Sequence, residues 1–139
     1  MEKPTHLIEF ETMLLGRHRH LDRSAYLLLS RLRSSGPMSI GQLSDAFGLD
    51  ASTLNRHTSA LLRGGLVERI PDPEGGIARK FRLTAEGERS LEEEREKNVR
   101  GLEKVLADWT PEDVAAFAGY LRRFNTDIER LAGRPWPRS

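Results

Sequence analysis

The sequence predicts a single, mainly α-helical domain that carries one small β-hairpin, which places it in the α+β class. Three observations lead to this prediction. Along most of the 139-residue chain, apolar side chains recur at helical spacing. Glycine, proline and helix-capping side chains divide these stretches into separate helices. One stretch, 66–83, instead shows two short strand patterns joined by a loop rich in turn-forming residues.

Two helices are predicted in the N-terminal segment 5–34. Apolar residues recur at helical spacing over 5–17, which has no internal proline and ends close to its one glycine. The second helix, 22–34, is apolar over much of its circumference and stops at Gly36 and Pro37. A helix that is apolar on most sides is usually buried, so we expect the second helix at the centre of the domain.

A pair of short, capped helices follows. Ser39 and Gln42 have the spacing of a capping box, in which each side chain bonds the backbone N–H of the other residue at the start of a helix. This helix is expected to end at Gly48, and Asp50 is placed to cap a second helix that ends near Arg63. Two short helices joined by a tight turn that contains glycine form the helix-turn-helix pattern.

A β-hairpin is predicted directly after the second of these helices. Residues 66–70 form an apolar-rich strand, and 71–76 are dense in proline and glycine. Apolar and basic side chains alternate over 79–83, as they do in a half-buried strand. A hairpin at this position is a wing, so residues 37–84 are predicted to form a winged helix-turn-helix that binds DNA.

The segment 85–132 is predicted to form a long connecting helix and a final helix, and residues 133–139 a mobile tail. Leu91 is the only large apolar residue between Ala85 and Asn98, so this part of the long helix is expected to run through solvent. Large apolar residues then return at steps of three and four, which is typical of helices that pack against each other. They are Val99, Leu102, Leu106 and Trp109, followed in the last helix by Val114, Phe117, Leu121, Phe124, Ile128 and Leu131.

The composition argues against several classes of protein. The absence of cysteine excludes a disulfide framework, a cysteine-based zinc site and a cysteine redox sensor. No apolar run approaches the roughly 18 residues of a membrane span, and the N-terminus lacks a secretory signal, so we expect a cytoplasmic protein with no membrane partner. The His18-Arg19-His20 run is poorly spaced for a metal site. No nucleophile–base pair, phosphate loop or dinucleotide fingerprint is present, so no enzyme activity, metal or cofactor is predicted.

Charge is unevenly distributed, although the net charge is only +1. The segment Arg17–Arg33 carries five arginines against one aspartate, a net +4, whereas Thr84–Lys104 carries five basic residues against seven glutamates, a net −2. Such asymmetry can orient a protein on DNA. Each run taken alone fits a solvated helix face equally well.

The helix 50–63 has a polar face that suits the major groove, because its apolar side chains all fall on the opposite, inner side at about 100° per residue. Arginine can bond guanine and asparagine can bond adenine, while hydroxyls and free N–H groups can hold phosphates. An ordinary solvated face is the alternative, but the capped partner helix and the wing favour DNA. The predicted contacts are Ser39 on the first helix, Ser52, Thr53, Asn55, Arg56, Ser59 and Arg63 on the second, and Arg79, Lys80 and Arg82 on the wing.

Three segments, 50–57, 61–69 and 83–87, resemble the MarR family of bacterial transcription regulators, and the resemblance extends over nearly the whole chain. It implies an obligate homodimer, a palindromic operator read by one helix per half-site, and in many members a small, often aromatic or phenolic, effector. The two reading helices would then lie about one DNA turn, roughly 34–36 Å, apart. The implied dimerisation residues are Leu7, Phe10 and Leu14 near the N-terminus and Leu106, Trp109, Phe117, Leu121, Phe124 and Ile128 near the C-terminus.

The wing departs from the family pattern. The family usually has Asp-x-Arg near the wing tip, where the aspartate braces an arginine that is aimed at the minor groove. The corresponding positions here are Gly75 and Ile77, so the braced arginine is absent. Either Arg79 takes over this contact or the wing contributes little to binding. Lys and Arg on the wing have a further interpretation as protection of an exposed sheet edge.

The sequence as a whole predicts a sequence-specific regulator of transcription that binds double-stranded DNA as a dimer, more often as a repressor, and is released by a small ligand. The alternative is a winged-helix module that binds another protein, which the weak net charge and the unusual wing leave open. A ligand carrier that does not bind DNA is disfavoured by the polar face around Ser52 and Arg56.

Overall fold

The computed structural model describes residues 3–18 and 23–138 and shows the mainly helical fold with a small two-stranded antiparallel sheet that the sequence predicts. Within these residues, no helix is long and apolar enough to cross a membrane. In chain order the elements are α1 (Pro4–Leu15), the 3-10 helix η1 (Gly16–His18), α2 (Ser24–Ser35), α3 (Ile40–Phe47), α4 (Ala51–Arg63), β1 (Val67–Ile70), β2 (Lys80–Leu83), α5 (Ala85–Val105) and α6 (Pro111–Ala132).

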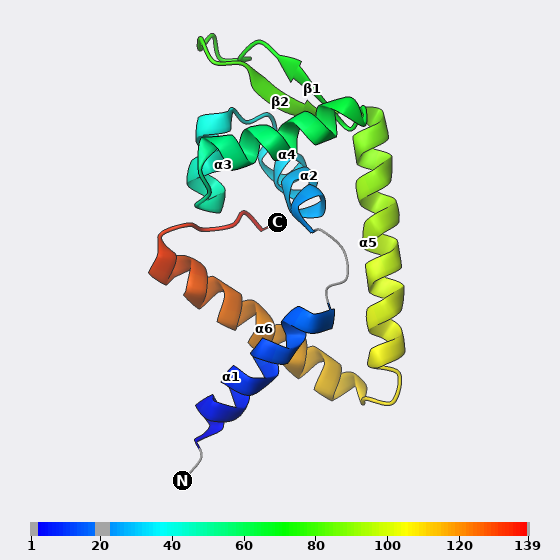
Figure 1. The fold of residues 1–139 in the computed structure, drawn as a ribbon. Helices are drawn as coiled ribbons and strands as arrows, with labels where there is room; N and C mark the ends of the chain where they lie inside the picture. The colour runs from blue at the N-terminus through cyan, green and yellow to red at the C-terminus, as the bar shows by residue number, and fades with distance from the viewer. Residues whose placement is uncertain (1–2, 19–22, 139) are drawn as a thin grey trace.

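The molecule has two regions joined by a long helix. Figure 1 shows α2, α3, α4 and the hairpin gathered at one end, α5 running away from them, and α6 with α1 at the other end. The hydrophobic core lies in the first region, where Leu28, Leu43 and Leu54 are almost completely buried. Leu91 adds α5 to this core, whereas the described parts of α1 and α6 contain no buried residue. The predicted central position of the second helix is thus confirmed.

Short-range hydrogen bonds set the limits of the two short helices as the sequence predicts. The Gln42 N–H donates to Ser39 Oγ over 3.2 Å, and the Ser39 N–H donates to Gln42 Oε1 over 2.9 Å, which completes the capping box. α3 ends at Gly48, whose φ of 66° is the left-handed conformation that favours glycine. The Thr53 N–H donates to Asp50 Oδ1 over 2.8 Å and opens α4.

The hairpin has a third short strand partner that the sequence did not reveal. β1 and β2 pair antiparallel, with Val67 opposite Leu83. Met38, in the turn between α2 and α3, exchanges two backbone hydrogen bonds with Phe81, of 3.2 and 2.8 Å. This isolated bridge joins the wing to the start of the helix-turn-helix. The strand β2 is thus hydrogen-bonded to β1 on one edge and to Met38 on the other.

A tight corner joins α4, β1 and α5. The Thr84 hydroxyl accepts a 3.0 Å hydrogen bond from the Gly87 N–H, which caps α5, and donates a 2.6 Å bond to the Gly65 carbonyl. Gly65 has φ +72°, so the turn after α4 needs glycine. A Cβ on Gly87 would lie 2.0 Å from the Leu66 carbonyl oxygen. The corner therefore fixes the direction in which α5 leaves the first region.

The structure corrects two expectations for the C-terminal part. The apolar steps through Leu106 and Trp109 were expected to continue the long helix, but α5 ends at Val105. Leu106 is its terminal cap, and the Trp109 N–H bonds the Leu106 carbonyl in a turn before Thr110 caps α6. The tail was expected to be mobile, yet residues 133–138 pack back against α2 and α3, with the Trp136 ring against Phe47.

Gly87→Ala is expected to lower the free energy of unfolding by about 1–3 kcal/mol, because the methyl group must displace the Leu66 carbonyl in a closely packed corner. Urea unfolding at a fixed protein concentration measures the change. Gly101→Ala in the same helix is the matched control, since a Cβ there meets nothing within 4 Å. The control should be neutral or stabilising, as alanine favours a helix over glycine. Equal effects of the two substitutions would contradict the assigned role of the corner.

Candidate DNA interface

The inner and outer faces of α4 are arranged as the helical spacing predicts. Leu54, Thr58 and Leu61 are buried, and the Thr58 hydroxyl donates a 2.8 Å hydrogen bond to the Leu54 carbonyl. On the opposite face the side chains of Ser52, Asn55, Arg56 and Arg63 are exposed, while Thr53 and Ser59 are half-buried. α4 thus presents one continuous polar surface to solvent beside the wing (Figure 1).

The start of α4 is less open to an anion than the sequence suggests. Asp50 accepts the Thr53 N–H and also the Ser52 hydroxyl, the latter over 2.9 Å. These hydrogen bonds from Thr53 and Ser52 hold the pKa of Asp50 below its usual value, so the carboxylate stays charged. Ser52 offers lone pairs rather than a proton to a partner, and the negative charge of Asp50 opposes a phosphate at this end. The Ser39 hydroxyl is likewise engaged as an acceptor in its own helix cap.

The three cations predicted on the wing differ in whether they already pair with an acidic side chain. Lys80 pairs with Asp72 at 3.5 Å, with both side chains largely buried, and the Arg82 Nε bonds Glu68 across the two strands at 3.0 Å. Arg79 is exposed, and within the described residues it has no ion pair or hydrogen bond. Arg79 is consequently the wing cation that can approach a phosphate without first breaking a contact.

Asp72 organises the loop at the wing tip, a role that the sequence analysis missed. It accepts the Glu74 N–H at its carboxylate over 2.9 Å and the Gly75 N–H at its backbone carbonyl over 3.0 Å. The bond from Glu74, followed by the charge of Lys80, lowers the pKa of Asp72. The turn-forming sequence around Asp72 was the available signal, because aspartate often bonds the backbone two residues ahead. Ile77 is fully exposed, so the tip itself carries an apolar side chain.

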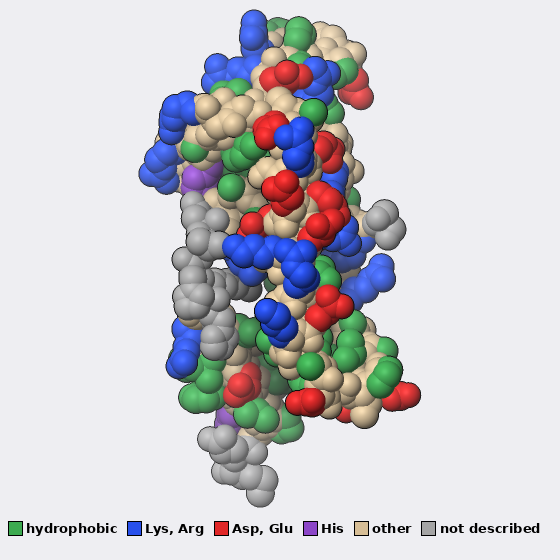
Figure 2. Space-filling view, turned by 90° about the vertical axis from the view of Figure 1, so that its right-hand side faces the viewer, with side chains coloured by type: hydrophobic (Ala, Val, Ile, Leu, Met, Phe, Trp, Pro, Cys, Tyr) green, Lys and Arg blue, Asp and Glu red, His purple; other side chains and the backbone are tan. Residues whose placement is uncertain are grey.

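Charged side chains are spread along the face of the molecule that carries α5, and they differ in sign between its parts. Figure 2, in which α5 faces the viewer, shows Lys and Arg side chains around the hairpin and α4, with Asp and Glu over the adjoining part of α5. Hydrophobic side chains gather at the opposite end, where α5 meets α6. The view agrees with the net −2 counted for Thr84–Lys104. The His18-Arg19-His20 run cannot be placed in this pattern, because residues 19–20 and the His18 side chain lie outside the described part of the chain.

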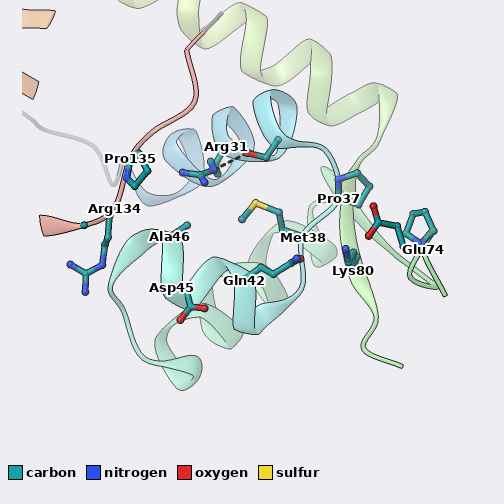
Figure 3. A pocket seen from close by; sticks show the side chains of 13 residues that line it. Arg31, Pro37, Met38, Gln42, Asp45, Ala46, Glu74, Lys80, Arg134 and Pro135 are labelled. Carbon is teal, nitrogen blue, oxygen red and sulfur yellow. Dashed lines mark hydrogen bonds between the residues drawn. The ribbon is translucent and has the colours of Figure 1, made fainter. Parts of the chain in front are cut away.

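A polar groove of about 630 Å³ runs between α2, α3, the wing and the C-terminal tail (Figure 3). Gln42 and Asp45 line it from α3, Lys80 from the wing and Arg134 from the tail. The Arg31 Nε donates a 2.8 Å hydrogen bond to Ser35 Oγ at one side of the groove. Burial lowers the pKa of Arg31, and its Nη1 is buried without a hydrogen-bond partner within the described residues. Nothing in the sequence pattern indicated this groove.

Comparison with known proteins places the chain among transcription regulators. A model of the MarR family matches residues 21–75. YxaD of Bacillus subtilis, described as an uncharacterized HTH-type transcriptional regulator, is 33% identical over an alignment of 135 positions that covers 89% of this chain and 94% of YxaD. The chain belongs to the MarR family. Members of this family regulate transcription, as the sequence analysis predicts for this chain.

Solved structures of the MarR family share the fold of this chain. A MarR family protein from Bacillus stearothermophilus has a TM-score of 0.73 at 26% identity, with 92% of this chain and 99% of that chain covered. The crystal structure of MarR gives a TM-score of 0.78 at 21% identity over 97% and 99% of the two chains, which shows a shared fold. The predicted family and the winged helix-turn-helix fold are therefore confirmed.

Substitution of Arg79 by alanine is expected to weaken binding to many DNA sequences alike and to reduce the slope of log affinity against log salt by about 1, because one phosphate contact is lost. Titration of DNA at several salt concentrations measures both quantities. Arg82→Ala is the matched control on the same hairpin, since its guanidinium already bonds Glu68. If Arg79→Ala altered the preference at one base position only, Arg79 would read sequence rather than hold a phosphate.

Proposed function

We propose that this MarR-family chain is a homodimeric, cytoplasmic repressor that binds a palindromic operator through α4 of each protomer and is released by a small effector. The observation that carries the proposal is the uninterrupted polar face of α4 beside the unpaired Arg79, on a molecule whose far end leaves large apolar side chains uncovered.

The dimer follows from the apolar surfaces of α1 and α6. Both helices lack buried residues, although they carry many large apolar side chains. A monomer would leave this contiguous apolar surface in water, whereas a second copy can cover it. Of the implied dimerisation residues, Leu14 and Leu106 are already half-buried within the chain. Those exposed and free to contact a partner are Leu7, Phe10, Trp109, Phe117, Leu121, Phe124 and Ile128.

A two-fold dimer of this chain would present two copies of α4, which supports a palindromic operator with half-sites one helical turn apart. Arg56 is exposed near the middle of α4, and it is the α4 cation best placed to reach a guanine in the major groove. Asn55 precedes it and can bond adenine, while Thr53 and Ser59 flank the same surface and Arg63 lies at the last turn.

The groove beside α3 supports the effector part of the proposal. Its volume of about 630 Å³ is in the range of small-molecule sites. Its lining reaches α3 and the wing, so an occupant would act on the DNA-binding region directly. The PcaV regulator of Streptomyces coelicolor, crystallised in complex with its natural ligand, is 26% identical to this chain with a TM-score of 0.61 over 88% of this chain and 91% of that one. An aromatic or phenolic acid is the proposed class.

Selection of bound sequences from a random DNA pool tests the function as a whole. The expected result is an inverted repeat with half-sites about ten base pairs apart, and its loss when a panel of phenolic acids is added. No binding even at low salt would contradict the proposal and favour the alternative in which the polar face of α4 binds a protein.

Arg56→Ala is expected to weaken binding to the selected operator by about 1–3 kcal/mol and to relax the preference at one base pair, because one bidentate contact is removed. Fluorescence titration with operators changed one base pair at a time measures both effects. Arg100→Ala is the control, since Arg100 is an exposed arginine on α5, away from α4. Unchanged affinity and unchanged preference would refute the role of Arg56.

Leu121→Glu in α6 is expected to convert the dimer to monomer, because a carboxylate would have to be buried in the apolar interface. Sedimentation equilibrium gives the oligomeric state. Thr126→Glu places the same charge on the opposite side of α6 and should leave the dimer intact. A dimer that tolerated Leu121→Glu as well as Thr126→Glu would mean that this face of α6 does not form the interface.

A further inference from the structure

Residues Gly133–Arg138 run from the end of α6 back to the DNA-binding region, and we name this segment the C-terminal strap. Gly133, at φ +69°, ends α6 and turns the chain, and the Arg134 N–H bonds the Glu129 carbonyl at 3.0 Å. Figure 1 shows the strap passing from the far end of α6 to a point beside α2 and α3. It thus crosses the gap between the two regions on the side away from α5.

The Arg134 and Trp136 side chains of the strap contact the turn of the helix-turn-helix. The Trp136 ring meets the Phe47 ring edge-on, with centroids 5.4 Å apart, and the Arg31 guanidinium lies 4.9 Å from the Trp136 ring. The Arg134 guanidinium covers Gly48, since its Cζ lies 2.7 Å from the place of a Cβ. Phe47 and Gly48 are the last residue and the cap of α3, so the strap binds the point at which the chain turns toward α4.

The C-terminal half of the strap folds back onto α6 and is fixed there through Glu129. The Trp136 N–H donates to Glu129 Oε1 over 2.8 Å, and the Arg138 guanidinium donates two bonds to the same carboxylate, of 2.7 and 2.6 Å. The bonds from Arg138 and Trp136 lower the pKa of Glu129 to about 2, so it remains an acceptor at neutral pH. The strap therefore bridges the two regions: the Trp136 N–H and Arg138 attach it to α6, and the Trp136 ring and Arg134 contact α2 and α3.

The strap is a second connection between the two regions of the molecule. α5 leaves the first region at the Thr84 corner, α6 runs back from the end of α5 toward that region, and the strap joins the end of α6 to it (Figure 1). The described residues of α6 add nothing to the buried core of the first region. Among the residues that the structure describes, α5 is the other connection that sets the angle between α6 and α4. The chain turns at both ends of α5, at Thr84 and at Leu106, and a second connection between the two regions restrains rotation about these turns.

We infer that the C-terminal strap is a positioning element that fixes the orientation of α4 relative to α6, with Trp136 as its central residue. Because α6 lies in the dimer interface, the same angle sets the separation and tilt of the two copies of α4 on DNA. This second consequence rests on the proposed function. The orientation of α4 relative to α6 within one protomer does not rest on the proposed function. The orientation and its consequence for DNA can therefore be tested separately.

Distance measurements between spin labels test the orientation without DNA. The chain has no cysteine, so Ala60→Cys on α4 and Thr126→Cys on α6, both exposed, give one defined pair. An excess of unlabelled chain limits each dimer to one labelled protomer. The full chain should give one narrow distance distribution, and both Trp136→Ala and a chain ending at Gly133 should broaden or shift it. Trp136→Phe keeps an aromatic edge against Phe47 and should retain the narrow distribution. An unchanged distribution in the shortened chain overturns the inference.

Operators with one base pair added or removed between the half-sites test the consequence for DNA. The full chain should discriminate sharply between spacings. Trp136→Ala should lose roughly tenfold in affinity for the best spacing, because the second α4 is no longer held in place for its half-site, and should bind the altered spacings almost as well. An equal loss at every spacing would mean that the strap only stabilises the fold, which overturns its positioning role. A full chain that bound no DNA would refute the proposed function and leave the label distances to decide the inference.

Discussion

The arrangement of this molecule depends on the close approach of Gly87 to the Leu66 carbonyl. This contact places the first turn of α5 directly on the turn that follows α4, and Thr84 ties the two together through the Gly65 carbonyl. The direction of α5 then determines where α6 and its apolar face lie. The segments 65–67 and 83–87, which lie within two of the stretches that resemble the family, are thus the two halves of one contact: Gly65 adopts φ +72° there, and a Cβ on Gly87 would meet the Leu66 carbonyl.

The features that could be predicted from the sequence are those that depend on interactions between residues close together in the chain. The capping box of Ser39, the cap at Asp50 and the inner face of α4 depend on neighbours within one or two turns, and the structure has them as expected. The pairing of Met38 with Phe81 joins positions more than forty residues apart through backbone atoms alone. No side-chain pattern records such a bond, so the third strand partner of the hairpin was not foreseen.

The tail and the wing show the same limit. The composition of Gly133–Arg138, rich in glycine and proline, is typical of a mobile tail. The segment is held in place by contacts with Phe47, Arg31 and Glu129, and the sequence does not show that these residues lie nearby. On the wing, the alternation of basic and apolar residues correctly predicted that Phe81 faces inward and Arg82 outward, but Lys80 is largely buried. The alternation could not show that Lys80 and Arg82 are held by Asp72 and Glu68, because ion pairs across a hairpin depend on the strand register.

The carboxylate of Asp50 has a consequence for how a duplex could lie against this surface. Helix N-termini commonly attract phosphate through the partial positive charge of their free N–H groups. Here that charge is already neutralised by the chain's own anion. A DNA backbone pointed at the tip of α4 would meet repulsion, whereas a backbone that passes alongside the helix would not. In the proposed complex with DNA, the acidic cap would thus favour some approach angles over others without touching a base.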